Sequence, residues 1–167
     1  LEAIEQLKSE FVGKQVRNVE ITTNPRWMSV CNIENPKTGL EAKFSYRMVA
    51  ALSLTGHNTA SLETFRDELC NDQEICSLAA KVHVTTSESI TEMASMVTIV
   101  TEDGHQHSAE HDLSATLTFD TKKRKLYDKS SSLIGKDNAD HLSDICFESK
   151  ESECEEISRF IRRVDSD

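Results

Sequence analysis

Residues 39–56 read GLEAKFSYRMVAALSLTG, a run of good helix formers that lies between two glycines. The turn chemistry of Thr38-Gly39 precedes it, so a helix is expected to begin no earlier than Leu40. Apolar residues recur at the spacing of one helical face, namely Phe44, Met48, Ala51 and Leu52. The pattern predicts one helix over residues 42–54, and Gly56 is the expected stop just past its end.

Donor side chains gather near the start of this expected helix. Lys43 and Arg47 are four residues apart, which would place both cationic heads on one side of a continuous helix. Helix N-termini favour anions, and Lys43, Ser45, Tyr46 and Arg47 would add donors there. The alternative for the two cations is a solvated helix face. The segment is therefore a candidate carboxylate-binding wall, in which Met48 is expected to face the core.

The pattern of the whole chain predicts an α+β fold in a single domain that spans residues 1–167. Helices are expected at 1–12, 42–54, after Ser61, after a capping box at Asn71–Glu74, at 121–134, at 138–147 and after a capping box at Ser152–Glu155. Strands are expected at 14–23, 81–86, 95–101 and 105–118, with a bulge in the first. The prediction is a small mixed or antiparallel sheet of about four strands covered by helices, with a helical C-terminal segment over 121–167.

The region between the first strand and the central helix carries the only tryptophan of the chain, Trp27. Residues 26–40 read as a loop. A tryptophan in a loop serves either as a core plug or as a binding surface, and a core plug is expected here.

The charge of the chain is acidic and uneven. The formal net charge is −10, which argues against nucleic acid or an anionic membrane as the main partner. Residues 1–57 hold seven Lys and Arg against six Asp and Glu, whereas residues 58–167 hold twelve against twenty-three. An anionic substrate would therefore meet least repulsion in the N-terminal third.

The cysteines and the hydropathy of the chain indicate the cellular compartment in which it is expected to fold. The five cysteines have no metal-like CxxC spacing, so free thiols in a reducing, cytoplasmic compartment are expected; they are Cys31, Cys70, Cys76, Cys146 and Cys154. No apolar run approaches the length of a membrane span. Because the chain starts without Met and opens directly in a helical pattern at Leu1, it is expected to be a piece of a longer protein.

Three histidines, His105, His107 and His111, invite a metal-site interpretation. Residues 105 and 107 would share one face of a strand. They follow a hairpin turn, however, and acidic and hydroxyl side chains surround them in the sequence. A solvated edge strand is the expected role, and zinc is the alternative.

The central segment resembles the A-K-F-S-x-x-Y…A-x-x-L-x-G segment of the MmgE/PrpD family, and the match here begins at Ala42. The likeness continues in order through SLETFRD at 61–67, SLAAKV at 77–82 and EDG at 102–104, and it covers most of residues 16–135. Each motif alone is weak evidence for the family, and the ordered series of motifs is more specific than any one of them. The family usually has Tyr where this chain has Met48, which puts any hydroxyl role at that position in question.

The resemblance implies a class of reaction and a second domain that would carry the acid–base residues. The family holds 2-methylcitrate dehydratases, cis-aconitate decarboxylases and iminodisuccinate epimerases, which act on small di- and tricarboxylic acids. It implies a hydro-lyase, decarboxylase or isomerase that abstracts a proton next to a carboxylate, with no cofactor and no metal. The main acid–base residues would lie in an N-terminal helical domain, so this chain alone is expected to be inactive. A homodimer is also implied.

Two other interpretations stay open. The chain is alternatively a non-catalytic, acidic interaction or structural module, or a relative whose substrate differs or whose catalysis has decayed. No catalytic residue is assigned within the chain, and the substrate-binding candidates are Lys43, Ser45, Tyr46, Arg47 and Met48.

Overall fold

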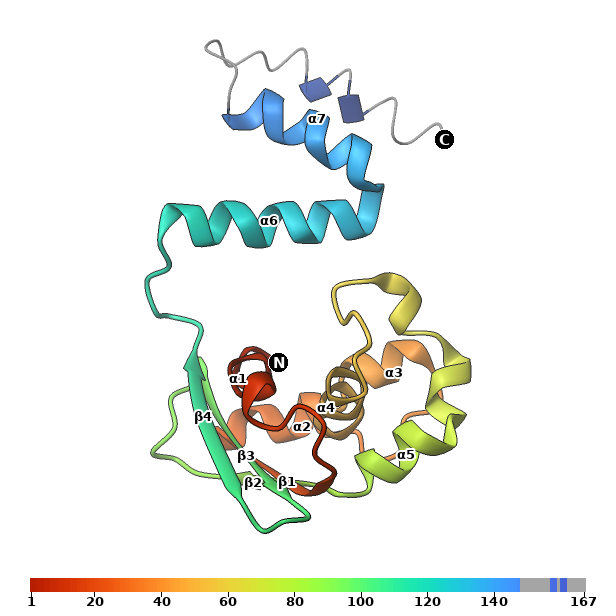
Figure 1. Ribbon diagram of the computed structural model, residues 1–167, viewed down its shortest axis with the longest axis vertical. Helices are drawn as coiled ribbons and strands as arrows, with labels where there is room; N and C mark the ends of the chain where they lie inside the picture. Colours follow the sequence, from red (N-terminus) through yellow and green to blue (C-terminus); the bar gives the residue numbers. More distant parts are fainter. Residues whose placement is uncertain (148–156, 159, 162–167) are drawn as a thin grey trace. The chain divides into compact units, whose positions relative to one another are not determined.

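The computed structural model describes residues 1–147, 157, 158, 160 and 161 (Figure 1). The contacts group into two compact units, residues 1–115 and 116–167, and each is described by itself. The capping box expected at Ser152 and Glu155 lies outside the described residues.

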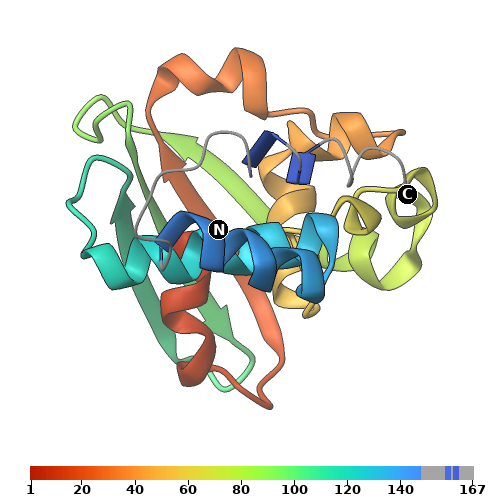
Figure 2. The ribbon, with the colours of Figure 1, turned by 90° about the horizontal axis from the view of Figure 1, so that it is seen from above.

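A four-stranded mixed sheet forms the centre of the first unit and confirms the predicted α+β fold. Its order is β2-β1-β3-β4, with bounds β1 (Val16–Thr23), β2 (Val82–Thr86), β3 (Ala94–Thr101) and β4 (Gln106–Asp112). β1 pairs in parallel with β2 and antiparallel with β3, and β3 pairs antiparallel with β4. Figure 2 shows β1 between its two neighbours. The predicted bulge in β1 is confirmed by a register shift between Val16 and Asn18.

The last strand is shorter than the predicted span of residues 105–118. The Oδ1 atom of Asp112 accepts hydrogen bonds from the backbone N–H and the hydroxyl of Ser114, both at 2.7 Å. These bonds hold the pKa of Asp112 below its usual value and turn the chain away from the sheet. A turn made by side chains therefore ends β4 at Asp112.

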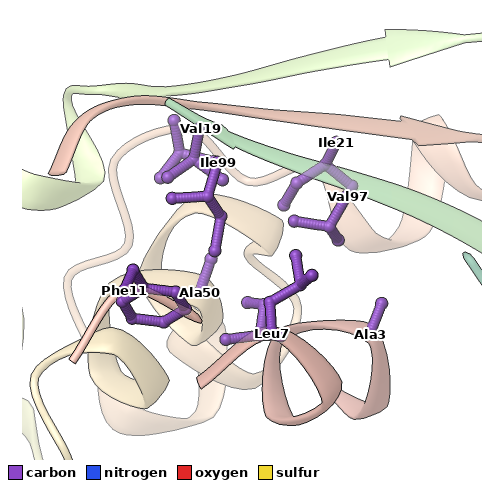
Figure 3. Packing of buried hydrophobic residues seen from close by; sticks show 10 residues of the cluster. Ala3, Leu7, Phe11, Val19, Ile21, Ala50, Val97 and Ile99 are labelled. Carbon is purple, nitrogen blue, oxygen red and sulfur yellow. The ribbon is translucent and has the colours of Figure 1, made fainter. Parts of the chain in front are cut away.

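Helices α1 (Glu2–Leu7) and α4 (Tyr46–Leu54) pack on one face of the sheet. Figure 3 shows Leu7 of α1 and Ala50 of α4 in one cluster with Val19 and Ile99, which are paired neighbours on β1 and β3. The other face is largely polar apart from Met96 and Val100, and hydroxyl pairs link its strands, as between Thr22 and Thr85 at 3.1 Å. One covered and one solvated face explains the alternating pattern of the strands.

The single helix predicted over residues 42–54 is wrong, because the chain forms two helices, α3 (Gly39–Lys43) and α4. Ser45 lies between them in an extended conformation (φ −122°, ψ 107°), and its side chain accepts a hydrogen bond from the backbone N–H of Met48 at 3.3 Å. The backbone N–H of Ile33 also donates to the carbonyl of Phe44 at 3.1 Å. These two bonds offer the backbone partners outside a continuous helix, so the helix breaks there.

Replacing Ser45 by Ala is expected to lower the free energy of unfolding by about 1 kcal/mol, because α4 loses its N-cap acceptor. Urea unfolding followed by the fluorescence of Trp27, the only tryptophan, measures the change in the first unit. Ser29→Ala, at an exposed position of α2 (Met28–Cys31), is the matched control and should stay within about 0.5 kcal/mol of the parent. Equal unfolding midpoints for the two variants would contradict the capping role.

The expected loop over residues 26–40 also contains regular structure, a 3₁₀ turn η2 (Pro25–Trp27) followed by α2. The expectation that Trp27 plugs the core is wrong, since this side chain is only half-buried. Its Nε1–H donates to the carbonyl of Glu92 at 2.8 Å, and the Arg26 guanidinium lies 5.2 Å from the ring centroid. The N–H of a half-buried indole requires an acceptor, and the carbonyl of Glu92 provides it.

Two 3₁₀ turns replace the short helix expected after Ser61, namely η3 (Leu62–Thr64) and η4 (Asp67–Asn71). Helix α5 (Gln73–Ala79) follows, and its N-cap is Asp72 rather than Asn71, with Oδ1 accepting from the N–H of Glu74 and Ile75. The turns dock on α3, where the N–H of Gly39 donates to Asp67 at 2.7 Å.

The second unit is helical in its described part, as predicted for the C-terminal segment. It contains α6 (Phe119–Ile134) and α7 (Lys136–Phe147), joined at Gly135 with a φ of +79°. The rings of Phe119 and Phe147 meet edge-on at 5.9 Å. Among the described residues, no helix combines the length and apolar character needed to cross a membrane.

Candidate functional site

A pocket of about 260 Å³ lies beside the start of α4 in the first unit. The lining comes from the loop before α3, from α4, and from η4 together with α5. Its charged and sulfur-containing residues are Glu34, Lys37, Arg47, Met48, Cys70 and Cys76. It is called the Arg47 pocket below. Residues from three separate segments therefore meet at one concave site.

Arg47 is held in a defined position at this pocket. Its Nη1 donates to Asn32 Oδ1 at 2.7 Å, and its Nη2 donates to Glu34 Oε1 at 3.3 Å. The exposed fraction of the side chain is 21% for Arg47 and 66% for Glu34. A guanidinium fork that is partly buried and already oriented suits a planar carboxylate.

Lys37 supplies the second cation of the pocket. Its side chain is exposed, while its backbone N–H donates to Glu41 Oε2 at 2.6 Å and so ties the loop to α3. Among the lining residues in the described part of the chain, Glu34 is the one carboxylate beside these two cations. The two cations give the lining residues a positive balance, although the carboxylates of Asp67 and Glu41 also lie near Cys70.

Another wall of the pocket is apolar and includes two cysteines, Cys70 and Cys76. Met48 is buried and belongs to the cluster around Leu52 and Ile75. Burial raises the pKa of the Cys70 thiol, and the nearby Asp67 acts in the same direction, so this cysteine is a thiol rather than a thiolate at neutral pH. Cys76 Sγ donates to the Cys70 carbonyl at 3.2 Å. Such a wall offers an apolar packing surface and, at Cys70, a protonated thiol rather than a nucleophilic thiolate.

The structure separates the residues that were expected to act together. Lys43 ends α3, with its Nζ 5.4 Å from the Phe65 ring centroid, while Arg47 lies on α4. The expectation that the two cations share one side of a helix is wrong, because the helix breaks at Ser45. Ser45 itself is buried and engaged as the cap of α4, so of the five candidates Arg47 and Met48 line the pocket.

Tyr46 lies on another side of α4, as its position two residues before Met48 indicates. It lines a separate, largely apolar pocket of about 590 Å³ together with Thr23 and Trp27. The Tyr46 hydroxyl lies 3.3 Å from Thr23 Oγ1, and burial raises the pKa of this phenol. Tyr46 therefore stays protonated at neutral pH and does not replace the missing hydroxyl at Met48.

Glu34 and Lys37 were not among the site residues predicted from the sequence. Glu34 meets Arg47 across thirteen positions of the chain, and the loop between them follows neither helical nor strand periodicity. Asn35-Pro36 is turn chemistry, which favours a reversal of the chain, but a turn signal contains no information on which side chain faces α4.

The histidines of β4 and its preceding turn occupy different environments. His105 is exposed, as expected for a solvated edge, with Nδ1 at 3.0 Å from Asp103. That expectation is wrong for His107, whose side chain is only 15% exposed and whose Nδ1 lies 2.6 Å from Glu10. The segment after α1 supplies Glu10 and thus covers this part of the strand. Within the described ranges, no three His, Cys, Asp or Glu side chains are grouped so as to hold a metal ion.

The mixed sheet, the helix pair on one face and the cation-lined pocket define an α+β domain with a candidate anion-binding site. The family model described as the MmgE/PrpD C-terminal domain matches residues 1–145. The chain therefore belongs to the MmgE/PrpD family, and it represents the C-terminal domain of that family. Among curated proteins, no significant match was found.

Proposed function

We propose that this chain is the C-terminal domain of a lyase or isomerase that acts on a small di- or tricarboxylic acid, as a 2-methylcitrate dehydratase-like hydro-lyase does. Membership of the family supports the reaction class. The observation that carries the proposal is the position of Arg47, whose guanidinium is oriented by Asn32 at the mouth of a small pocket.

The proposed reaction requires the cations of the Arg47 pocket to bind the carboxylates of the substrate. Removing a proton next to a carboxylate places negative charge on the carboxylate oxygens, and a fixed cation stabilises that charge. Arg47 would bind one carboxylate, Lys37 a second one, and Met48 would pack against the carbon chain. The base and the acid would come from an N-terminal helical domain, so the site would be completed by that domain, in a homodimer within a reducing cytoplasm.

Replacing Arg47 by Gln is expected to weaken binding of tricarballylate, an unreactive tricarboxylate, by about tenfold, because a charge-assisted hydrogen bond is lost. Titration calorimetry or NMR chemical shifts with the 167-residue chain measure the affinity. Arg66→Gln is the matched control, since Arg66 is exposed and pairs with Glu63 in the same turn. Unchanged affinity in the Arg47 variant, with binding by the parent chain, would refute the proposed site.

A second interpretation within the same family is favoured by Met48. Because the family's usual Tyr is absent there, and Tyr46 faces a different pocket, the substrate or the reaction of the parent protein would differ from that of relatives with the hydroxyl. A non-catalytic acidic module is the remaining alternative. Turnover of 2-methylcitrate or cis-aconitate by the full-length protein distinguishes these possibilities.

A further inference from the structure

The carboxylate-binding side of Arg47 is already occupied by an acid from the protein itself. Nη2 of Arg47 pairs with Glu34, while Nη1 is held by the amide oxygen of Asn32. We propose that Glu34 is a displaceable internal carboxylate, which a ligand must replace on Arg47, so that a ligand needs a second carboxylate contact at the same pocket to offset the cost of displacement. This inference rests on the proposed function of the Arg47 pocket.

The two contacts of Arg47 differ in the way this role requires. The bond to Asn32 is short, at 2.7 Å, and it fixes the guanidinium. The contact to Glu34 is 3.3 Å, longer than a strong charge-assisted bond, and the Glu34 side chain is 66% exposed. Because the Glu34 side of this ion pair is exposed and the contact is long, the carboxylate can move into solvent at little cost. Asn32 keeps Arg47 in place after Glu34 leaves.

Displacement of Glu34 has a consequence for selectivity. A ligand carboxylate gains Arg47 only by breaking the existing pair, and it then lies close to the released Glu34, which repels it. A monocarboxylate has no second contact to offset this cost. A ligand with a second carboxylate can also contact Lys37, which lines the same pocket three positions after Glu34. The loop therefore carries both the competing charge and the cation that favours a dianion.

The test compares tricarballylate with butyrate, a monocarboxylate, as ligands of the 167-residue chain. Glu34→Gln keeps the shape of the side chain and removes its charge, so butyrate affinity is expected to rise about threefold to tenfold, and tricarballylate affinity by at least the same factor, because each ligand must displace Glu34 and the more highly charged one is repelled more by it. Lys37→Gln is expected to lower the affinity for tricarballylate and to leave the affinity for butyrate unchanged. Glu63→Gln, which removes an exposed partner of Arg66 outside the pocket, is the matched control and should change neither affinity.

The outcomes separate this inference from the proposed function. Tighter butyrate binding by Glu34→Gln, with an unchanged unfolding midpoint, supports displacement. Binding equal to or weaker than that of the parent, while Arg47→Gln still loses affinity, overturns the role of Glu34 and leaves the carboxylate site intact. Absence of tricarballylate binding by the parent chain overturns both.

Discussion

Gly39→Ala is expected to lower the free energy of unfolding of the first unit by about 3 kcal/mol. A Cβ atom at Gly39 would lie 1.8 Å from the carbonyl oxygen of Phe65 and 2.4 Å from its carbonyl carbon. Both atoms belong to the backbone, so no side chain can rotate away to make room. The turns that follow Ser61 would have to separate from α3, and the hydrogen bond from Gly39 to Asp67 would be lost.

Urea unfolding followed by Trp27 fluorescence measures this effect, with Gly104→Ala as the control. Gly104 has a φ of +84°, and a Cβ atom added there would meet open space, so its replacement costs only backbone strain of about 1 kcal/mol. A Gly39 variant as stable as the parent would show that the approach of Phe65 to α3 is not as close as described. Because Cys70 of η4 lines the Arg47 pocket, tricarballylate affinity should fall together with stability.

Leu52→Ala is expected to lower the free energy of unfolding by about 2–5 kcal/mol, because it leaves a cavity in a packed cluster. Leu52 lies on α4 with an exposed fraction of 1%, among Ala42, Met48 and Ile75. Leu40 is the matched control from the same segment, since 67% of it is exposed, and Leu40→Ala should change stability by about 0.5 kcal/mol or less.

The same unfolding experiment distinguishes these two leucines. If both variants lost equal stability, the assignment of Leu52 to the core would be wrong. The comparison also bears on function, because Met48 belongs to the Leu52 cluster and lines the Arg47 pocket. A collapse of the cluster into the cavity that Leu52→Ala leaves would shift that wall and weaken ligand binding without touching either cation.

Much of the sheet could be predicted from local patterns. Val19 and Ile21 alternate with the exposed Glu20, and the turn at Asp103-Gly104 joins β3 to β4 as expected. The order of the strands could not be predicted in this way. β1 pairs in parallel with β2, more than fifty residues further along the chain, and no residue of either strand identifies its partner.

Several errors have a common origin. Phe44, Trp27 and His107 were each interpreted from their immediate neighbours in the chain. In each case a group from elsewhere in the chain is the partner: the N–H of Ile33 on the Phe44 carbonyl at the helix break, the carbonyl of Glu92 on the indole, and Glu10 on the imidazole. A polar group is satisfied by whichever partner the fold brings within hydrogen-bonding distance, and sequence spacing alone does not contain that information.

The amino-acid sequence was sufficient for the α+β class and for the glycine-bounded segment over residues 39–56 as a region of interest, because apolar periodicity and turn chemistry are local properties. The family followed from the resemblance of its motifs, which the family model confirms. The pairing of Arg47 with Glu34, the separation of Lys43 from Arg47 and the pocket between three segments arose from tertiary packing. The physical reason is that burial of apolar surface is non-directional and tolerant of detail, whereas ion pairs and hydrogen bonds depend on distances of a few ångströms that are set when the loops close over the core.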